Sequence, residues 1–226
     1  MNQEEFWIEL PALSPHAPRR LIVFLHAAGA TTSALVPFAV AWQRKFPGAT
    51  AALLAGNMRA PQGGREWFAT LPLEDRTERV ELARKTALLR IEMLQRTLDF
   101  LPNQTILVGW SQGATLAIEL ARCTPTPAAI VVAYASQLAR PLQFNEPLLP
   151  TFHLLHGELD SVVPVGQGQK AWRSLRAAGA DVTLDVMTEA AHELGPGMVS
   201  LGTTRVMQTL FRGRHPANLA SVAALH

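Results

Sequence analysis

Six short aliphatic runs, separated by segments with helical patterning, constrain the fold of this chain more than any other feature. Each run has the length of a strand and is bounded by turn-forming residues, which is typical of strands buried on both faces in a parallel sheet. The runs cover residues 20–27, 50–55, 105–109, 128–133, 151–157 and 181–187.

The segments between these runs predict helices. One helix, capped by Ser33, is expected to run to about Phe46, and a longer one is expected to begin at Asp75 or Thr77 and to end near Leu101. Further helices are expected over 112–122, 165–178 and 198–211. The apolar residues of the long helix recur every three or four positions: Ala87, Ile91, Leu94, Leu98 and Leu101. This alternation predicts an α/β fold whose mostly parallel sheet carries helices on both faces.

The composition supports one domain over residues 1–226, with 213–226 as a short C-terminal tail. The chain is 48% hydrophobic and 17% charged, so a large buried core is expected. The net charge is only +2, and Lys and Arg form no block, which argues against a nucleic-acid partner.

Several sequence features favour a cytoplasmic location. The acidic start "MNQEEFW" is unlike a secretory signal, and no apolar run has the length of a membrane helix. Cys123 is the single cysteine, so it cannot form an internal disulfide, and this suits a reducing compartment.

The stretch "LVGWSQGATL" places Ser111 between two glycines, at the junction of a predicted strand and a predicted helix. A sharp strand-to-helix turn strains its middle residue and crowds the backbone, and Gly109 and Gly113 supply the room that this turn needs. The bare G-x-S-x-G pattern is common by chance, but at this junction it predicts a nucleophile elbow with Ser111 as the nucleophile.

A serine nucleophile needs a base, and in this fold the base follows the acid in the sequence. The histidines after Ser111 are His153, His156, His192, His215 and His226. His153 lies within a strand and is expected to pack in the core, and the last two lie in the tail. His156 comes just before Asp160, so it does not fit the order in which the base follows the acid. His192, in the loop after the last strand, is therefore the expected base.

Two carboxylates compete for the role of the acid. Asp160 and Glu158 share the stretch "LLHGELDSVVP", a strand followed by a turn, and Asp160 is favoured because it ends that turn. Backbone donors for an oxyanion are expected at Gln112, directly after the nucleophile, and at Ala28, in the loop after an early strand. His26, in the same loop, is expected to be structural.

With these residues placed, the chain resembles the phospholipase–carboxylesterase family, which includes acyl-protein thioesterases and small bacterial serine esterases. The resemblance rests on "FLHAAGA", "GGREWF", "LVGWSQGATLAIEL", "LLHGELDSVVP" and "VTLDVMTEAAHEL". It implies an α/β-hydrolase fold, and cleavage of ester or thioester bonds with no metal and no organic cofactor. The expected strands and helices leave no stretch long enough for a large cap domain. The resemblance also implies that Trp67 lies beside the substrate pocket. The loop over 56–73, which carries Trp67 and Phe68, is expected to form an open, partly aromatic groove.

Two departures from the family pattern bear on function. Ala27 stands where the family usually has glycine, and a positive φ there would strain the oxyanion loop. Ala69 follows the Trp-Phe pair where thioesterase-like members tend to have aspartate, which favours a small-molecule ester. The expected function is a serine carboxylesterase for short- to medium-chain esters.

Alternatives to this function stay open. They are a lysophospholipase or acyl thioesterase with the same triad, and a non-catalytic ligand-binding form of the fold. The oligomeric state is also open, with a homodimer as one option, and no stable membrane insertion is expected.

Overall fold

The computed structural model describes residues 6–17, 19–61, 63–69, 75–143 and 146–212. Within them, one sheet has the strand order β1-β3-β2-β6-β7-β8-β9, and every neighbouring pair is parallel except β1 with β3. The strands are β1 (Trp7–Leu10), β2 (Arg20–Leu25), β3 (Ala49–Leu54), β6 (Thr105–Trp110), β7 (Ile130–Tyr134), β8 (Thr151–Gly157) and β9 (Val182–Met187). The six strands expected from the sequence are confirmed within a few residues.

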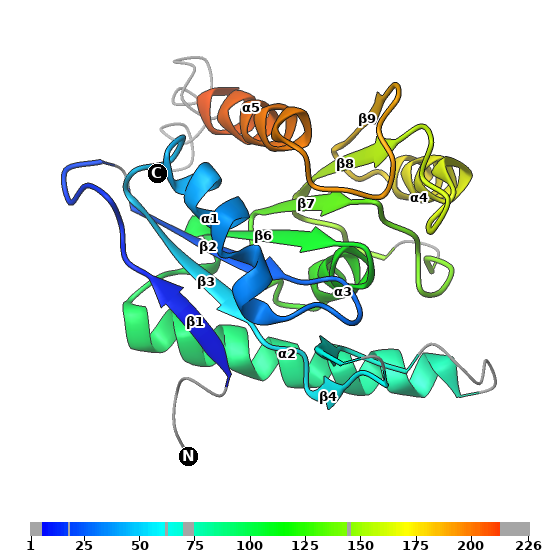
Figure 1. Ribbon diagram of the computed structural model, residues 1–226, viewed down its shortest axis with the longest axis horizontal. Helices are drawn as coiled ribbons and strands as arrows, with labels where there is room; N and C mark the ends of the chain where they lie inside the picture. The colour runs from blue at the N-terminus through cyan, green and yellow to red at the C-terminus, as the bar shows by residue number, and fades with distance from the viewer. Residues whose placement is uncertain (1–5, 18, 62, 70–74, 144–145, 213–226) are drawn as a thin grey trace, which may run out of the picture.

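Helices cover both faces of this sheet, as expected (Figure 1). They are α1 (Val36–Gln43), α2 (Arg76–Leu98), α3 (Gln112–Ala121), α4 (Val165–Ala177) and α5 (Pro196–Arg212), with short 3₁₀ helices η2 (Thr32–Leu35) and η3 (Pro102–Gln104). Buried side chains of α2, α3 and α4 pack in one apolar cluster on the sheet, and those of α1 and α5 pack in a second cluster. The sheet therefore separates two cores.

Two short elements were not expected. The edge strand β1 carries four residues, too few for an alternating pattern to stand out, yet it buries Trp7 to 4% exposure and pairs with β3. The small hairpin of β4 (Met58–Arg59) and β5 (Arg65–Glu66) lies in the long loop after β3, and Arg65 also bridges to Ala30 in the loop after β2.

Two predicted helix ends are wrong for local reasons. Thr31, rather than Ser33, caps the first helical segment, because its hydroxyl accepts the N–H of Ala34 and the chain begins with a 3₁₀ turn. The long helix α2 ends at Leu98, because Asp99 adopts a left-handed conformation with φ 55°. Leu101 consequently lies outside the helix, and it is 62% exposed instead of buried.

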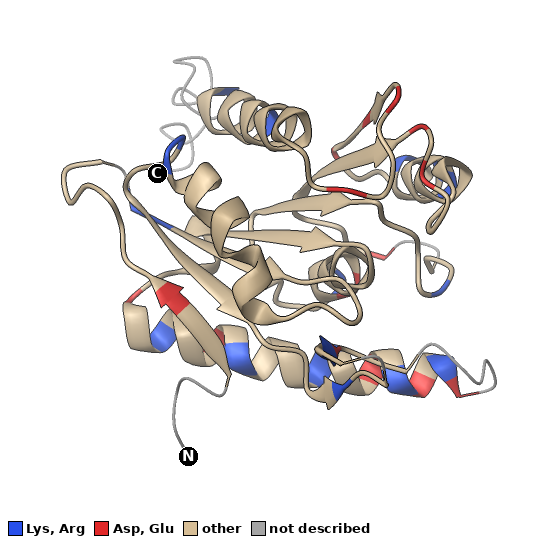
Figure 2. Cartoon of the chain, in the orientation of Figure 1, with Lys and Arg blue, Asp and Glu red and all other residues tan. Residues whose placement is uncertain are grey.

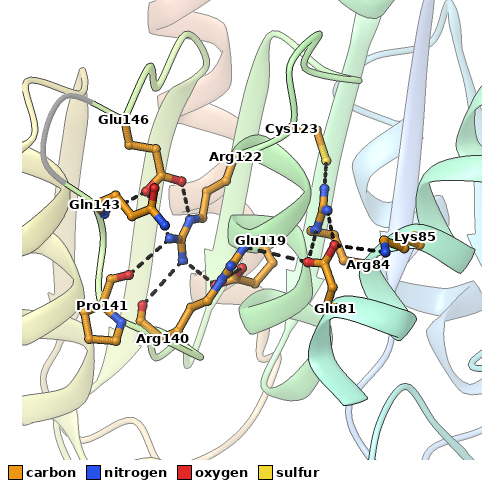
Figure 3. A network of polar contacts seen from close by, with 10 residues as sticks. All are labelled: Glu81, Arg84, Lys85, Glu119, Arg122, Cys123, Arg140, Pro141, Gln143 and Glu146. Carbon is orange, nitrogen blue, oxygen red and sulfur yellow. Dashed lines mark hydrogen bonds and ion pairs between the residues drawn. The ribbon is translucent and has the colours of Figure 1, made fainter. Parts of the chain in front are cut away.

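A buried charge network anchors the end of α3 to the loop after β7 (Figure 3). Arg122, which follows α3, donates to Glu119, to both carboxylate oxygens of Glu146 and to the carbonyl of Pro141, while Arg140 contacts the other oxygen of Glu119. Burial alone would lower the pKa of Arg122, but the two carboxylates outweigh it and hold that pKa above its ordinary value. The network fixes this loop to the helix that carries the elbow.

Charged residues of both signs alternate along α2, whereas the strands carry few of them (Figure 2). None of the helices in the described ranges is both long and apolar enough to cross a membrane.

Candidate functional site

Ser111 occupies the turn between β6 and α3. Its backbone has φ 56° and ψ −114°, a conformation that costs of order 1–3 kcal/mol for a residue with a side chain. Two hydrogen bonds hold it there. The Ser111 N–H donates to the Tyr134 carbonyl at 2.9 Å, and its own carbonyl accepts the Thr115 N–H at 3.0 Å. Because β6 runs parallel to its neighbours, this turn lies at the carboxyl edge of the sheet.

Gly109 and Gly113 stand where this turn brings backbone into close contact. A Cβ on Gly109 would lie 2.4 Å from the Gly113 carbonyl oxygen, and a Cβ on Gly113 would lie 2.2 Å from the carbonyl oxygen of Leu25, at the end of β2. Any side chain at either position would push α3 away from the sheet. The expected role of the two glycines is confirmed, and Gly113 also brings α3 against the loop that follows β2.

Asp160 and His192 meet although 32 residues separate them. Asp160 lies in the turn after β8, and His192 lies in the loop after β9, its parallel neighbour. Since the carboxyl ends of parallel neighbours share one edge, the two loops are adjacent, and a backbone hydrogen bond from Leu159 to Ala190 joins them at 3.0 Å. The His192 Nδ1 lies 2.8 Å from an oxygen of Asp160.

The carboxylate of Asp160 is buried and hydrogen-bonded through both oxygens. Its side chain is 0% exposed, and its second oxygen accepts the N–H groups of Val162 and Val163 at 2.9 and 2.8 Å. Burial alone would raise the pKa of Asp160, but the hydrogen bonds from His192, Val163 and Val162 outweigh burial, so this pKa lies below its ordinary value. An ionised Asp160 can only accept, so Nδ1 of His192 carries a proton and a neutral ring keeps Nε2 free to take another.

The ring of Trp110, the residue before Ser111, lies against the ring of His192. The centroids are 5.5 Å apart and the planes are inclined by 30°. The His192 side chain remains 16% exposed, so it is reachable from solvent. The structure thus brings His192, Asp160 and the immediate neighbour of Ser111 to one edge of the sheet.

His26 has a structural environment, as expected. Its ring is buried, its Nε2 accepts the Gly56 N–H at 2.9 Å, and its Nδ1 therefore carries the proton and donates to the Ala27 carbonyl at 2.7 Å. Burial lowers the pKa of His26, which keeps the ring neutral. Ala27 is not among the described residues with positive φ, and Gly29 takes that conformation instead, with φ 78°. The loop therefore accommodates Ala27 without the strain considered above.

The side chain of Gln112 connects the elbow to the segment at Trp67 and Phe68. Its Oε1 accepts the Trp67 N–H at 2.8 Å, and its Nε2 donates to the Phe68 carbonyl at 2.7 Å. Both aromatic side chains are buried, at 1% and 2% exposure, and the indole N–H of Trp67 donates to the His26 carbonyl. Their expected contact with substrate stays a prediction. Ala28 is an exposed residue in the turn after β2.

The other candidates from the sequence have different environments. Glu158 is exposed, and His153 is buried between the hydroxyls of Thr183 and Thr209. His156 is also buried, and its Nε2 lies 2.7 Å from the Val163 carbonyl and 3.6 Å from the Asp160 oxygen that contacts His192, so it lies behind the carboxylate with its Nε2 engaged by a backbone carbonyl. His215 and His226 lie outside the described residues, as does the predicted tail over 213–226.

Three contributions to the site were not expected from the sequence. These are the contact of the Trp110 ring with His192, the hydrogen bonds of the Gln112 side chain to residues 67 and 68, and the two backbone N–H groups that donate to Asp160. Only the last has a local signal, because an aspartate commonly accepts backbone N–H groups two and three residues later in an Asx-turn. The Gln112 side chain joins residues 45 positions apart, so no local sequence pattern predicts its hydrogen bonds.

Several known proteins are similar to this chain. A family model described as Phospholipase/Carboxylesterase matches residues 10–203. The esterase YpfH of Escherichia coli K12 is 29% identical over 200 residues, which cover 86% of this chain and 83% of YpfH.

Solved structures share the fold. Esterase PE8 superposes with a TM-score of 0.81 at 26% identity and covers 89% of this chain and 97% of its own. The Bacillus cereus carboxylesterase reaches a TM-score of 0.76 at 17% identity, over 89% and 93% of the two chains. With the elbow, the carboxyl-edge loops and the family match together, this chain belongs to the phospholipase/carboxylesterase family of α/β-hydrolases and is a serine hydrolase of carboxylic esters.

Proposed function

We propose that this protein hydrolyses short- to medium-chain carboxylic esters of small molecules through an acyl-enzyme, with Ser111, His192 and Asp160 as the triad. Ser111 Oγ attacks the ester carbonyl while His192 takes its proton, and the protonated His192 then gives that proton to the leaving alkoxide. Water attacks the acyl-enzyme while its proton passes to His192, and His192 then returns that proton to Ser111 Oγ as the carboxylic acid leaves. Asp160 orients the ring and stabilises the imidazolium, and no metal or organic cofactor is needed.

The oxyanion of each tetrahedral intermediate would be held by the backbone N–H groups of Gln112 and Ala28. Within the described residues neither N–H has a hydrogen-bond partner, whereas the neighbouring Gly29 and Ala30 donate to Arg65 and Ala27. Gln112 also opens α3, where the first N–H groups have no partner in the helix and favour negative charge.

One observation carries the proposal: His192 Nδ1 lies 2.8 Å from a buried Asp160 whose other oxygen accepts two backbone N–H groups. A surface histidine does not require a partner held in this way, whereas a general base requires a fixed tautomer. The names of the esterase YpfH and esterase PE8 support ester hydrolysis as the reaction.

Labelling with a fluorophosphonate probe tests the nucleophile, because such probes react covalently with an activated serine. The wild-type protein and Ser174→Ala, a serine substitution on α4, should label, and Ser111→Ala should not. Hydrolysis by Ser111→Ala should fall by about 10⁴–10⁶-fold in kcat, since triad members act as a unit. Labelling of a folded Ser111→Ala protein would show that another residue is the nucleophile.

A further inference from the structure

A groove of about 650 Å³ runs between α1 and the start of α5. Trp110 and Leu194 line its end near the catalytic edge, next in sequence to Ser111 and close to His192. Apart from Ser200, Arg44 and Lys45, every residue of the lining is apolar. The groove is therefore an apolar path that starts beside the proposed triad.

The far end of this groove carries two cations. Arg44 and Lys45 directly follow α1, both are exposed, and neither has a carboxylate partner within the described residues. Figure 2 shows this positive charge at the turn after α1, beyond a helix that carries no charged residue of its own. At a rise of about 1.5 Å per residue, Arg44 lies roughly 15 Å along the groove from Ala34.

The side on which the groove opens decides which part of an ester it faces. His192 must deliver its proton to the leaving oxygen, so the alcohol portion departs next to the histidine ring. Trp110 contacts that ring and also lines the groove, and Leu194 lies two residues after His192. The groove is thus placed to receive the alcohol portion of the substrate.

We propose that the groove selects esters whose alcohol is an apolar chain ending in an anion, with Arg44 and Lys45 as the residues that recognise the anion. This inference rests on the proposed function. The apolar walls bury the methylene groups of the chain, each worth about fourfold in binding. Only an alcohol chain long enough to reach Arg44 and Lys45 can place its anion beside them. The preference for an anionic end should therefore increase with the length of the alcohol chain.

The test compares butyrate esters of ω-hydroxy acids with their primary amides, which have the same length and no charge. The alcohol chain is varied from roughly four to fourteen carbons, a range that spans the roughly 15 Å between Ala34 and Arg44 along the groove. At low salt the anionic ester should have a kcat/KM about three- to tenfold above that of the amide for the longer chains, and the ratio should approach one for the shortest. Salt of about 1 M should abolish the preference. Esters ending in phosphate distinguish a phosphate ligand from a carboxylate.

Two variants assign the effect to the cations. In the double variant Arg44→Gln/Lys45→Gln the ratio should fall towards one, whereas Arg96→Gln, an exposed arginine on α2, should keep the wild-type ratio. Calorimetry with Ser111→Ala protein provides a readout without turnover, in which the ω-hydroxy acid should bind more tightly than its amide.

The outcomes separate the two proposals. If wild-type protein cleaves both esters with equal kcat/KM at every length, the anion site is wrong and the esterase function stands. A preference that survives the double variant also overturns the site. If neither ester is cleaved and no fluorophosphonate labelling occurs, the proposed function fails, and the inference fails with it.

Discussion

At the scale of single residues, the hydrogen bonds of Asp160 predict how its replacement by asparagine would affect the ring of His192. The N–H groups of Val162 and Val163 both point at one oxygen, so in Asp160→Asn the amide oxygen must stay there and the NH₂ group must face His192. That group donates where the carboxylate accepted, and it therefore imposes the wrong tautomer on the ring. We expect kcat to fall by about 10⁴-fold, as in a comparable triad.

The control for this change is Glu158→Gln, which alters an exposed carboxylate in the same turn. Esterase assays on both variants, with circular dichroism to establish folding, decide the assignment. A larger loss in Glu158→Gln than in Asp160→Asn would mean that the acid has been assigned to the wrong residue.

His153 predicts how stability depends on pH. Its buried ring lies between Thr183 and Thr209, and burial lowers its pKa to about 4. Between pH 6.5 and 4 the unfolded chain binds a proton at this position and the folded chain does not. The contribution of His153 is therefore fully present above about pH 6.5 and is lost as pH falls to about 4, up to about 3 kcal/mol. The lowered pKa of His26 acts in the same direction.

Urea unfolding at a series of pH values measures this dependence. The wild-type free energy of unfolding should decline between pH 6.5 and 4, and His153→Gln, though less stable at neutral pH, should show a clearly shallower decline. Parallel curves for the two proteins would exclude His153 as a source of acid sensitivity.

At the scale of helices and strands, the network at the end of α3 should be a main determinant of stability. The Arg122 side chain is 2% exposed and that of Glu119 is 0% exposed, so Arg122→Met leaves a buried carboxylate with only Arg140 as its cationic partner. Breaking a buried pair from one side costs about 3–5 kcal/mol. Chemical denaturation should show this loss, whereas Lys85→Gln, which removes an ion pair whose lysine is 65% exposed, should cost at most about 1 kcal/mol. Equal effects from both substitutions would argue against a structural role for the network.

The elements that could be predicted from the sequence are those with strong local signals. The six buried strands are continuous aliphatic runs, and the elbow follows from two glycines at a strand–helix junction. The strand β1 and the end of α2 depend on other information. Trp7 gains its burial from pairing with β3, and Asp99 ends the helix with a backbone conformation that no local pattern required.

The features of the site also fall into two groups: those that the local sequence predicts and those that depend on contacts between distant segments. The turn after β8 and the loop after β9 could be placed at one edge, because parallel strands end together. The contact of Trp110 with His192 and the hydrogen bonds of Gln112 to residues 67 and 68 join segments 44 to 82 positions apart. Only the packed structure determines them.

At the scale of the whole molecule, the described connections between strands contain helices and one small hairpin, and no separate cap covers the carboxyl edge within those ranges. We therefore expect kcat/KM on p-nitrophenyl esters to peak between acetate and octanoate, because each buried methylene adds about 0.8 kcal/mol only until the site is full. Activity should not rise abruptly when substrate forms micelles. A maximum at palmitate, or strong activation at the micellar threshold, would contradict this open site.

The strand order also has a consequence for the time at which the enzyme becomes active during its synthesis. Ser111 follows β6, Asp160 follows β8 and His192 follows β9, so the three residues leave the ribosome in that order and far apart in time. A nascent chain that has already formed the elbow lacks both the proposed base and the proposed acid, and β9 must pair with β8 before His192 can reach Asp160. With the proposed triad, Ser111 therefore becomes reactive only in a chain whose sheet is nearly complete.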